Sequence, residues 1–195
     1  MPDLPEVSVD MVGPKRHSSR MAPMVASIAL AALFVACATL GAPAQQGGLG
    51  PSETVRIETA RGEIVIEVFP QAMPKTVANF KKLVQSGFYN GLTWHRVEDW
   101  VVQTGDPTAT GAGGSGVNVA FETTPLLPNT RGAVGMARRA NDMNSATSQF
   151  YILKADAQGL NGQYAVFGRV VRGMNVVAAL AKGDKIVRAT LEQLK

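Results

Sequence analysis

Cysteine and histidine are scarce in this chain of 195 residues, which has one cysteine and two histidines. Cys37 lies in an uncharged apolar stretch near the N-terminus, so the rest of the chain has no disulfide and no thiol nucleophile. His17 and His95 are too few to build a histidine-based metal site. We therefore expect a domain without a metal ion and without cysteine chemistry.

Concentrated charge is lacking as well. The formal net charge is +4, and beyond residue 44 no run of lysine and arginine is longer than two residues. Scattered charges of this kind are typical of a solvated, mildly basic surface, so we expect no nucleic-acid partner. The hydrophobic content of 46% allows a domain to bury its core without disulfides.

Residues 1–44 have the order of an export signal. A basic, polar start precedes residues 21–40, which carry no charge. Ala42-Pro43-Ala44 then supplies the small residues of an A-x-A cleavage site. This order predicts a secretory signal peptide that is cleaved near Ala44.

Cleavage there leaves a linker over residues 45–53 and one domain over residues 54–195. Two alternatives stay open, namely lipidation at Cys37 and retention of residues 21–40 as an anchor, because about 20 apolar residues suffice to span a bilayer. Under each alternative the domain lies outside the cytosol, either periplasmic or secreted. It contacts a membrane only through a retained or lipidated leader.

The pattern of apolar residues predicts a mainly β domain with two helices. We expect strands over residues 55–59, 63–69, 92–97, 100–103, 133–137, 149–153, 165–171 and 186–191, and helices over residues 74–86 and 174–182. Ala60-Arg61-Gly62 is too short for a crossover, so the first two strands should form an antiparallel hairpin. Many short antiparallel strands favour a closed antiparallel barrel, which leaves no exposed edge.

Residues 108–119 form a glycine-rich stretch in which Gly111, Gly113 and Gly116 have the dinucleotide-binding spacing G-x-G-x-x-G. No helical pattern follows, and no second βαβ half exists that a dinucleotide would span. We interpret this stretch as a flexible loop and expect no cofactor.

The stretch from Tyr89 to Asp106 contains an arginine, a glutamine and two tryptophans in an apolar setting, which suggests a functional site. Strand alternation directs His95 away from Arg96, so we expect His95 to be structural. Without a motif, the apolar residues of this region would be ordinary core.

Three ordered blocks supply that motif. They are Trp94-His95-Arg96-Val97 with Trp100-Val101-Val102-Gln103 and Gly105-Asp106-Pro107; Met136-Ala137-Arg138 with Ser145 to Ile152; and Leu160-Asn161-Gly162 with Val166 to Val170. In these blocks, over roughly residues 54–192, the chain resembles the cyclophilin family of peptidyl-prolyl cis/trans isomerases. The resemblance implies an eight-stranded barrel capped by two helices.

The resemblance also implies a function and a site. The activity would be rotation of X-Pro peptide bonds in proline-containing polypeptides, by a monomer that assists the folding of exported proteins. Arg96 would donate to the twisting amide, and Gln103 would steady Arg96 and the substrate backbone. The implied substrate-binding residues are Trp100, Val101, Tyr151 and Leu160 for the proline ring, and Ala137, Arg138, Gln149 and Tyr164 for the preceding residues.

The sequence differs from the family's motif at one turn, and two other functions are considered. Glu98-Asp99 replaces the usual proline-glycine between the first two segments of the motif, and the connection is one residue shorter. A non-catalytic proline-peptide binding module or chaperone is the alternative function, although a pure binder has no need of Arg96. A hydrolase using Ser115 or Ser145 lacks a G-x-S-x-G elbow.

Overall fold

The structure is a computed structural model that describes residues 48–192. The expected export signal lies outside the described residues, as do the first three residues of the linker, 45–47. None of the helices that the structure describes is long and apolar enough to cross a membrane. The first strand begins at Glu53, one residue before the expected start of the domain, and Leu49 already packs against the core.

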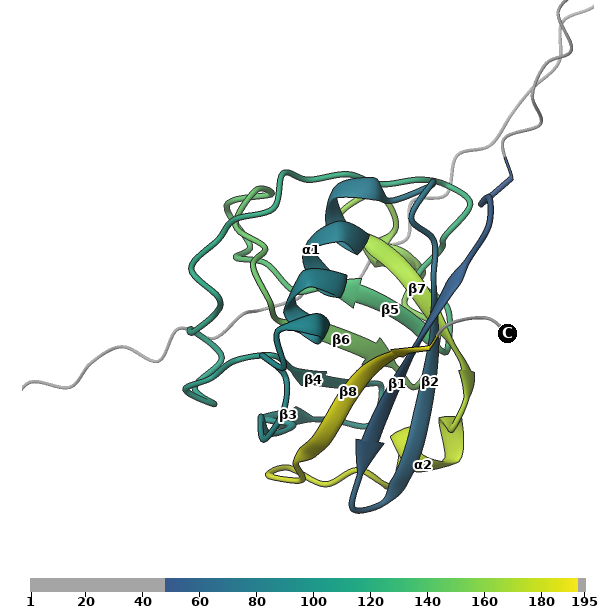
Figure 1. Cartoon of the computed structure of the whole chain (residues 1–195). Helices are drawn as coiled ribbons and strands as arrows, with labels where there is room; N and C mark the ends of the chain where they lie inside the picture. Colours follow the sequence, from purple (N-terminus) through teal and green to yellow (C-terminus); the bar gives the residue numbers. More distant parts are fainter. Residues whose placement is uncertain (1–47, 193–195) are drawn as a thin grey trace, which may run out of the picture.

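The described chain folds into one antiparallel sheet of eight strands with two α-helices (Figure 1). The strands are β1 (Glu53–Thr59), β2 (Gly62–Val68), β3 (Arg96–Val97), β4 (Val101–Thr104), β5 (Ala133–Met136), β6 (Phe150–Leu153), β7 (Val166–Arg172) and β8 (Ile186–Glu192). The helices are α1 (Pro74–Gln85) and α2 (Met174–Ala179), with a single 3-10 turn at Gln158–Leu160. The mainly β prediction is confirmed.

The order of strands in the sheet is β3-β4-β6-β5-β7-β2-β1-β8. β1 and β2 pair antiparallel from Glu53 opposite Val68 to Thr59 opposite Gly62, so the expected hairpin is correct. Because β4 and β6 are neighbours in space, the motif around Arg96 and the block around Tyr151 meet near the β3 edge of the sheet.

The described residues do not show the expected closed barrel, because the two edge strands β3 and β8 do not pair with each other. The sheet is a curled half-barrel. The predicted strand over residues 92–97 is reduced to two residues, Arg96–Val97. The residues just before them instead form hydrogen bonds with the segment that precedes β8. Thr93 forms one antiparallel bridge with Lys185, and Trp94 donates to the carbonyl of Asp184 at 2.8 Å.

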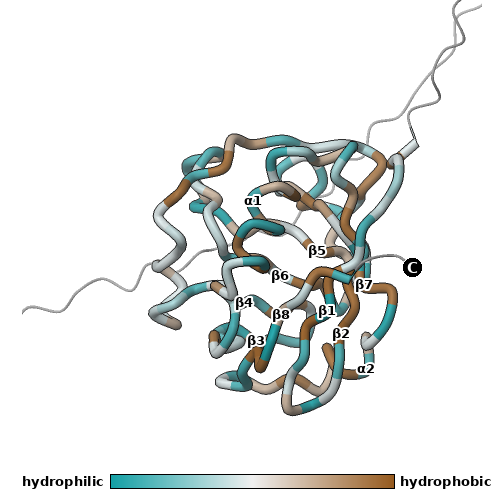
Figure 2. Tube along the Cα trace, in the orientation of Figure 1, coloured by the Kyte–Doolittle hydropathy of each residue, from teal (hydrophilic) through white to brown (hydrophobic). Residues whose placement is uncertain are grey.

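Helix α1 supplies the central residue of the core. Pro74 occupies its first turn, where a missing N–H costs nothing, and Gly87 ends it with φ +71°. Phe80 is fully buried, and its ring lies 4.9 to 5.4 Å from the rings of Tyr89, Phe150 and Phe167. Figure 2 shows apolar segments along the strands that surround this cluster.

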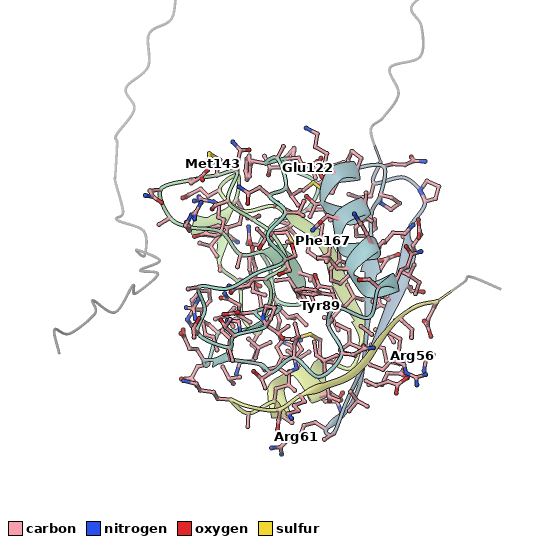
Figure 3. The ribbon with its side chains drawn as sticks, turned by 60° about the vertical axis from the view of Figure 1, so that its left-hand side comes forward. Arg56, Arg61, Tyr89, Glu122, Met143 and Phe167 are labelled. Atoms are coloured by element: carbon pink, nitrogen blue, oxygen red, sulfur yellow. The ribbon has the colours of Figure 1, made fainter. Side chains whose placement is uncertain are left out.

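The aromatic cluster and the polar surface are well separated. Figure 3 shows Tyr89 and Phe167 in the interior, whereas Arg56 and Arg61 lie at the periphery. The short helix α2 packs against β2, with Val176 and Val177 as its buried residues. The packed core therefore gives β3, β4, β5 and β6 a rigid support.

Candidate active site

A chain of side-chain hydrogen bonds joins three of the sequence-predicted residues. Arg96 and Gln103 lie opposite each other in β3 and β4, and Arg96 Nη1 donates to Gln103 Oε1 at 3.4 Å. Gln103 Nε2 then donates to Gln149 Oε1 at 2.8 Å. The two amides are thereby fixed in orientation, and they place the guanidinium at one end of a polar row.

The glycine-rich loop holds the far end of this row. Gln149 Nε2 donates to the carbonyl oxygens of Gly111 and Gly113 at 2.9 and 2.7 Å. The loop is held in turn by the buried carboxylate of Asp106, which accepts backbone N–H bonds from Thr108, Gly111 and Gly113 at 2.8, 2.7 and 3.2 Å. The loop has no regular secondary structure, yet these bonds tie it to the site.

Two further residues contact Arg96 from the β3–β4 turn. Glu98 accepts bonds from Nε and Nη2 of Arg96 at 2.6 and 3.1 Å. The guanidinium carbon lies 5.3 Å from the centre of the Trp100 ring, within range of a cation–π contact. Hydrogen bonding to the Arg96 guanidinium holds the pKa of Glu98 below its ordinary value, so Glu98 is ionised at neutral pH.

The second half of the site is built around Tyr151. Its ring meets that of Tyr164 edge-on at 6.1 Å, and the guanidinium of Arg138 lies 4.6 Å from the centre of the Tyr164 ring. Tyr151 lies opposite Gln103 in the β4–β6 pair and covers Gly135 of β5, where a side chain would clash with its ring. The register of the sheet therefore joins the aromatic half of the site to the Arg96 half.

Arg138 is held by carbonyl groups instead of acids. It donates to Gln163 at 2.9 Å, to Arg139 at 2.8 Å and to Ala140 at 2.9 Å. A small hollow beside it is lined by apolar residues, including Val119, Met136, Met143, Ala146 and Ala165. Met143 lies at the edge of the molecule (Figure 3).

The remaining predicted residues also belong to this region. The backbone N–H of Ala137 donates to the carbonyl of Gln149 at 2.9 Å. Val101 is fully buried and Tyr151 is 2% exposed, so both are core residues in this structure. Trp100 and Leu160 are partly buried against the same core. Hydrogen bonds, ring contacts and strand pairing therefore join eight of the ten residues named from the sequence, whereas Val101 and Leu160 are placed only by their packing in or against the core.

The sequence did not indicate two of the residues that hold Tyr151 in place. The Tyr151 hydroxyl donates to Asn129 Oδ1 at 2.6 Å, and Asn129 donates from Nδ2 to Asn161 Oδ1 at 3.2 Å. Burial raises the pKa of Tyr151, which keeps this hydroxyl protonated as a donor. No sequence signal marked Asn129. By contrast, an aspartate two residues before Thr108 is a recognisable turn signal and points to the anchoring role of Asp106.

His95 is buried beneath the site, as expected for a structural residue. It is 9% exposed, and neither ring nitrogen makes a hydrogen bond in the structure. Burial lowers the pKa of His95, although Asp106 and Gln149 favour its protonated form. Arg96 and Lys182 act in the same direction as burial. The imidazole is therefore neutral at pH 7 in the folded protein.

This burial makes stability depend on pH. The unfolded chain protonates His95 near its ordinary pKa of about 6.5, whereas the folded chain does so only at lower pH. We expect the free energy of unfolding to be greatest above pH ~6.5 and to decrease as the pH falls through the unfolded and then the folded pKa. Urea denaturation across this range, with His95→Gln as control, measures the effect. An equal slope in both proteins would contradict it.

No group of three or more metal-ligating side chains occurs among residues 48–192. The site instead offers a charged donor, two fixed amides and an aromatic surface. Such a set can hold a peptide and donate hydrogen bonds to it, without forming a covalent bond.

Comparison with known proteins agrees with this geometry. Residues 54–193 match the family model described as cyclophilin type peptidyl-prolyl cis-trans isomerase/CLD. A probable peptidyl-prolyl cis-trans isomerase of Brucella abortus is 39% identical over 191 residues, which cover 86% of this chain and 96% of that protein. Peptidyl-prolyl cis-trans isomerase B of Bacillus subtilis is 41% identical over 133 residues, covering 67% of this chain and 91% of that protein.

Solved structures show the same relation. A cyclophilin type peptidyl-prolyl cis-trans isomerase of Cryptosporidium parvum superposes with a TM-score of 0.70 at 29% identity, covering 74% of this chain and 100% of that one. A structure of the same protein in the presence of the dipeptide Ala-Pro gives 0.68 at 30% identity, with 72% and 99% covered. The family expected from the sequence is confirmed: the chain belongs to the cyclophilins and is a cyclophilin-type peptidyl-prolyl cis-trans isomerase.

Proposed function

We propose that Arg96 is the catalytic donor of this isomerase. The observation that carries the proposal is the position of its guanidinium at the end of the Gln103–Gln149 row, on a side chain that is 23% exposed. A charged donor that is fixed but still reachable is what the reaction requires. Gln103 steadies both Arg96 and the substrate backbone.

The chemistry of the reaction explains this requirement. Rotation about an X-Pro bond passes through a twisted amide that has lost resonance, over a barrier of ~18–20 kcal/mol. The nitrogen of the twisted amide becomes pyramidal and more basic, so a donor placed beside it stabilises the transition state more than either ground state. Arginine suits this role because it stays charged and donates in a fixed fork.

The substrate is a proline-containing polypeptide. The Cryptosporidium parvum relative was solved in the presence of Ala-Pro, which supports this substrate for the present site. The proline ring lies against Trp100 and Leu160, which are partly exposed, whereas Val101 and Tyr151 belong to the core in this structure. The residues before the proline lie along Ala137, Arg138 and Gln149, with Tyr164 at the rim.

The cellular role is the folding of exported proteins, by a monomer outside the cytosol. Its support is the order of residues 1–44, a basic start, an uncharged stretch and a small-residue cleavage site. Expression of the full chain, cell fractionation and N-terminal sequencing test this role. An N-terminus just after Ala44, at Gln45, is compatible with a cut signal, and a lipid on Cys37 with a lipoprotein. Full-length protein in the cytosol would contradict export.

A non-catalytic proline-peptide binding module remains the second candidate, because the partly buried Trp100 and Leu160 offer apolar surface to a peptide whether or not its bond is rotated. Exchange spectroscopy on an Ala-Pro peptide distinguishes the two. Uncatalysed exchange takes tens of seconds or longer, and the enzyme should bring it into the range of line broadening. Peptide shifts that change on binding without faster exchange would favour the binding module.

A further inference from the structure

The turn between β3 and β4 places a carboxylate directly on the guanidinium of Arg96. Glu98 contacts Nε at 2.6 Å and Nη2 at 3.1 Å, which is a side-on bidentate ion pair. Gln103 contacts the remaining nitrogen, Nη1, at 3.4 Å. The Trp100 ring lies 5.3 Å from the guanidinium carbon. Arg96 is therefore held along two edges and on one face.

These contacts leave a defined set of donors free. A guanidinium has five N–H groups in a rigid plane. Glu98 takes one from Nε and one from Nη2, and Gln103 takes one from Nη1. One N–H group of Nη1 and one of Nη2 are left, and they can donate to a bound peptide.

Ordering this side chain in advance has energetic consequences. A free arginine loses rotamer entropy when it is fixed, and a side chain that is already held loses less. The carboxylate also weakens the positive potential of Arg96, which opposes catalysis. Orientation prevails, because the twisted amide carries no net charge and depends on a donor in the right place.

We propose that Glu98 is a positioning residue for the isomerisation, which fixes the Arg96 guanidinium and leaves one N–H group of Nη1 and one of Nη2 for the substrate. The proposal rests on the catalytic role of Arg96 given above. It assigns a use to the acidic pair that replaces proline-glycine in this turn. Trp100 completes the support by covering one face of the guanidinium.

The test is replacement of Glu98 in the protein as the cell processes it. We expect Glu98→Gln to lower kcat/KM about fivefold, since an exposed ion pair contributes up to about 1 kcal/mol. Asp99→Asn is the matched control, because Asp99 is an exposed acid in the same turn. It should leave kcat/KM unchanged. Glu98→Asp should restore part of the loss, because it keeps the charge on a shorter stem.

Two readouts separate positioning from general stability. Glu98→Gln should cause no further loss of activity in an Arg96→Ala background, because Glu98 acts only through Arg96. In the NMR spectrum, the Arg96 Nε proton, assigned with Arg96→Lys, should exchange with water faster in Glu98→Gln than in Asp99→Asn. The same fold-loss with and without Arg96 would overturn the proposal.

The outcomes also separate this proposal from the one on which it rests. If Arg96→Ala keeps full activity, the role of Arg96 is wrong and that of Glu98 falls with it. If Arg96→Ala is slow but Glu98→Gln behaves like Asp99→Asn, only the positioning role is wrong. A Glu98→Gln variant that is faster than the parent would show that the carboxylate restrains Arg96 instead of positioning it.

Discussion

Replacing Arg96 with alanine is expected to lower kcat/KM for an Ala-Pro peptide by about 100-fold, because it removes a preorganised charged donor from the transition state. The effect should appear mainly in kcat, since the proline surface of Trp100 and Leu160 is left in place. Exchange spectroscopy at several peptide concentrations measures both constants. Thermal unfolding should change little, because Arg96 is partly exposed at the edge strand β3.

Two companion variants sharpen this result. Arg96→Lys keeps the positive charge but lacks the planar fork, so we expect an activity about tenfold below the parent and above Arg96→Ala. Arg61→Ala removes another guanidinium, at the β1–β2 turn, and should leave the rate unchanged. If Arg96→Ala accelerated exchange as well as the parent does, catalysis would come from the apolar surface alone.

Alternation of apolar residues predicted most strands to within a residue or two. Residues 63–69 were expected for β2, which the structure gives as Gly62–Val68, and residues 186–191 for β8, which it gives as Ile186–Glu192. Such strands are predictable because one face is buried along their whole length. The strand over residues 92–97 could not be predicted correctly, because an alternating pattern does not show which part of the chain the backbone pairs with.

In the site, too, some features could be predicted from the sequence and others could not. The proximity of Arg96, Gln103 and Gln149 followed from the motif, and the hydrogen bonds between them agree with it. The contact of Glu98 with Arg96 did not follow, because a charged residue in a short turn normally faces water. The glycine-rich loop was expected to be flexible from its composition, but its order depends on the single carboxylate of Asp106.

That dependence leads to the second large effect, in Asp106→Ala. Burial raises the pKa of Asp106, but hydrogen bonds from Thr108, Gly113 and Gly111 outweigh it and lower the pKa, so the carboxylate is charged at neutral pH. Its loss leaves three backbone N–H groups without their acceptor. We expect the free energy of unfolding to decrease by about 2 kcal/mol, less than for a fully buried charge pair, because the freed loop can bind water.

The same change should also reach the catalytic residues, although Asp106 makes no contact with Arg96. Once Gly111 and Gly113 move, Gln149 loses its two carbonyl partners and no longer orients Gln103. We expect kcat/KM to fall about tenfold, measured at a temperature where circular dichroism shows the variant to be folded. Asp156→Ala, which removes an exposed carboxylate that accepts one backbone bond at 2.7 Å, is the control and should affect neither quantity strongly.

A folded Asp106→Ala variant with full activity would show that the loop and the amide row are not coupled. Loss of activity with unchanged Gln149 and Gln103 side-chain amide signals would place the effect elsewhere in the site.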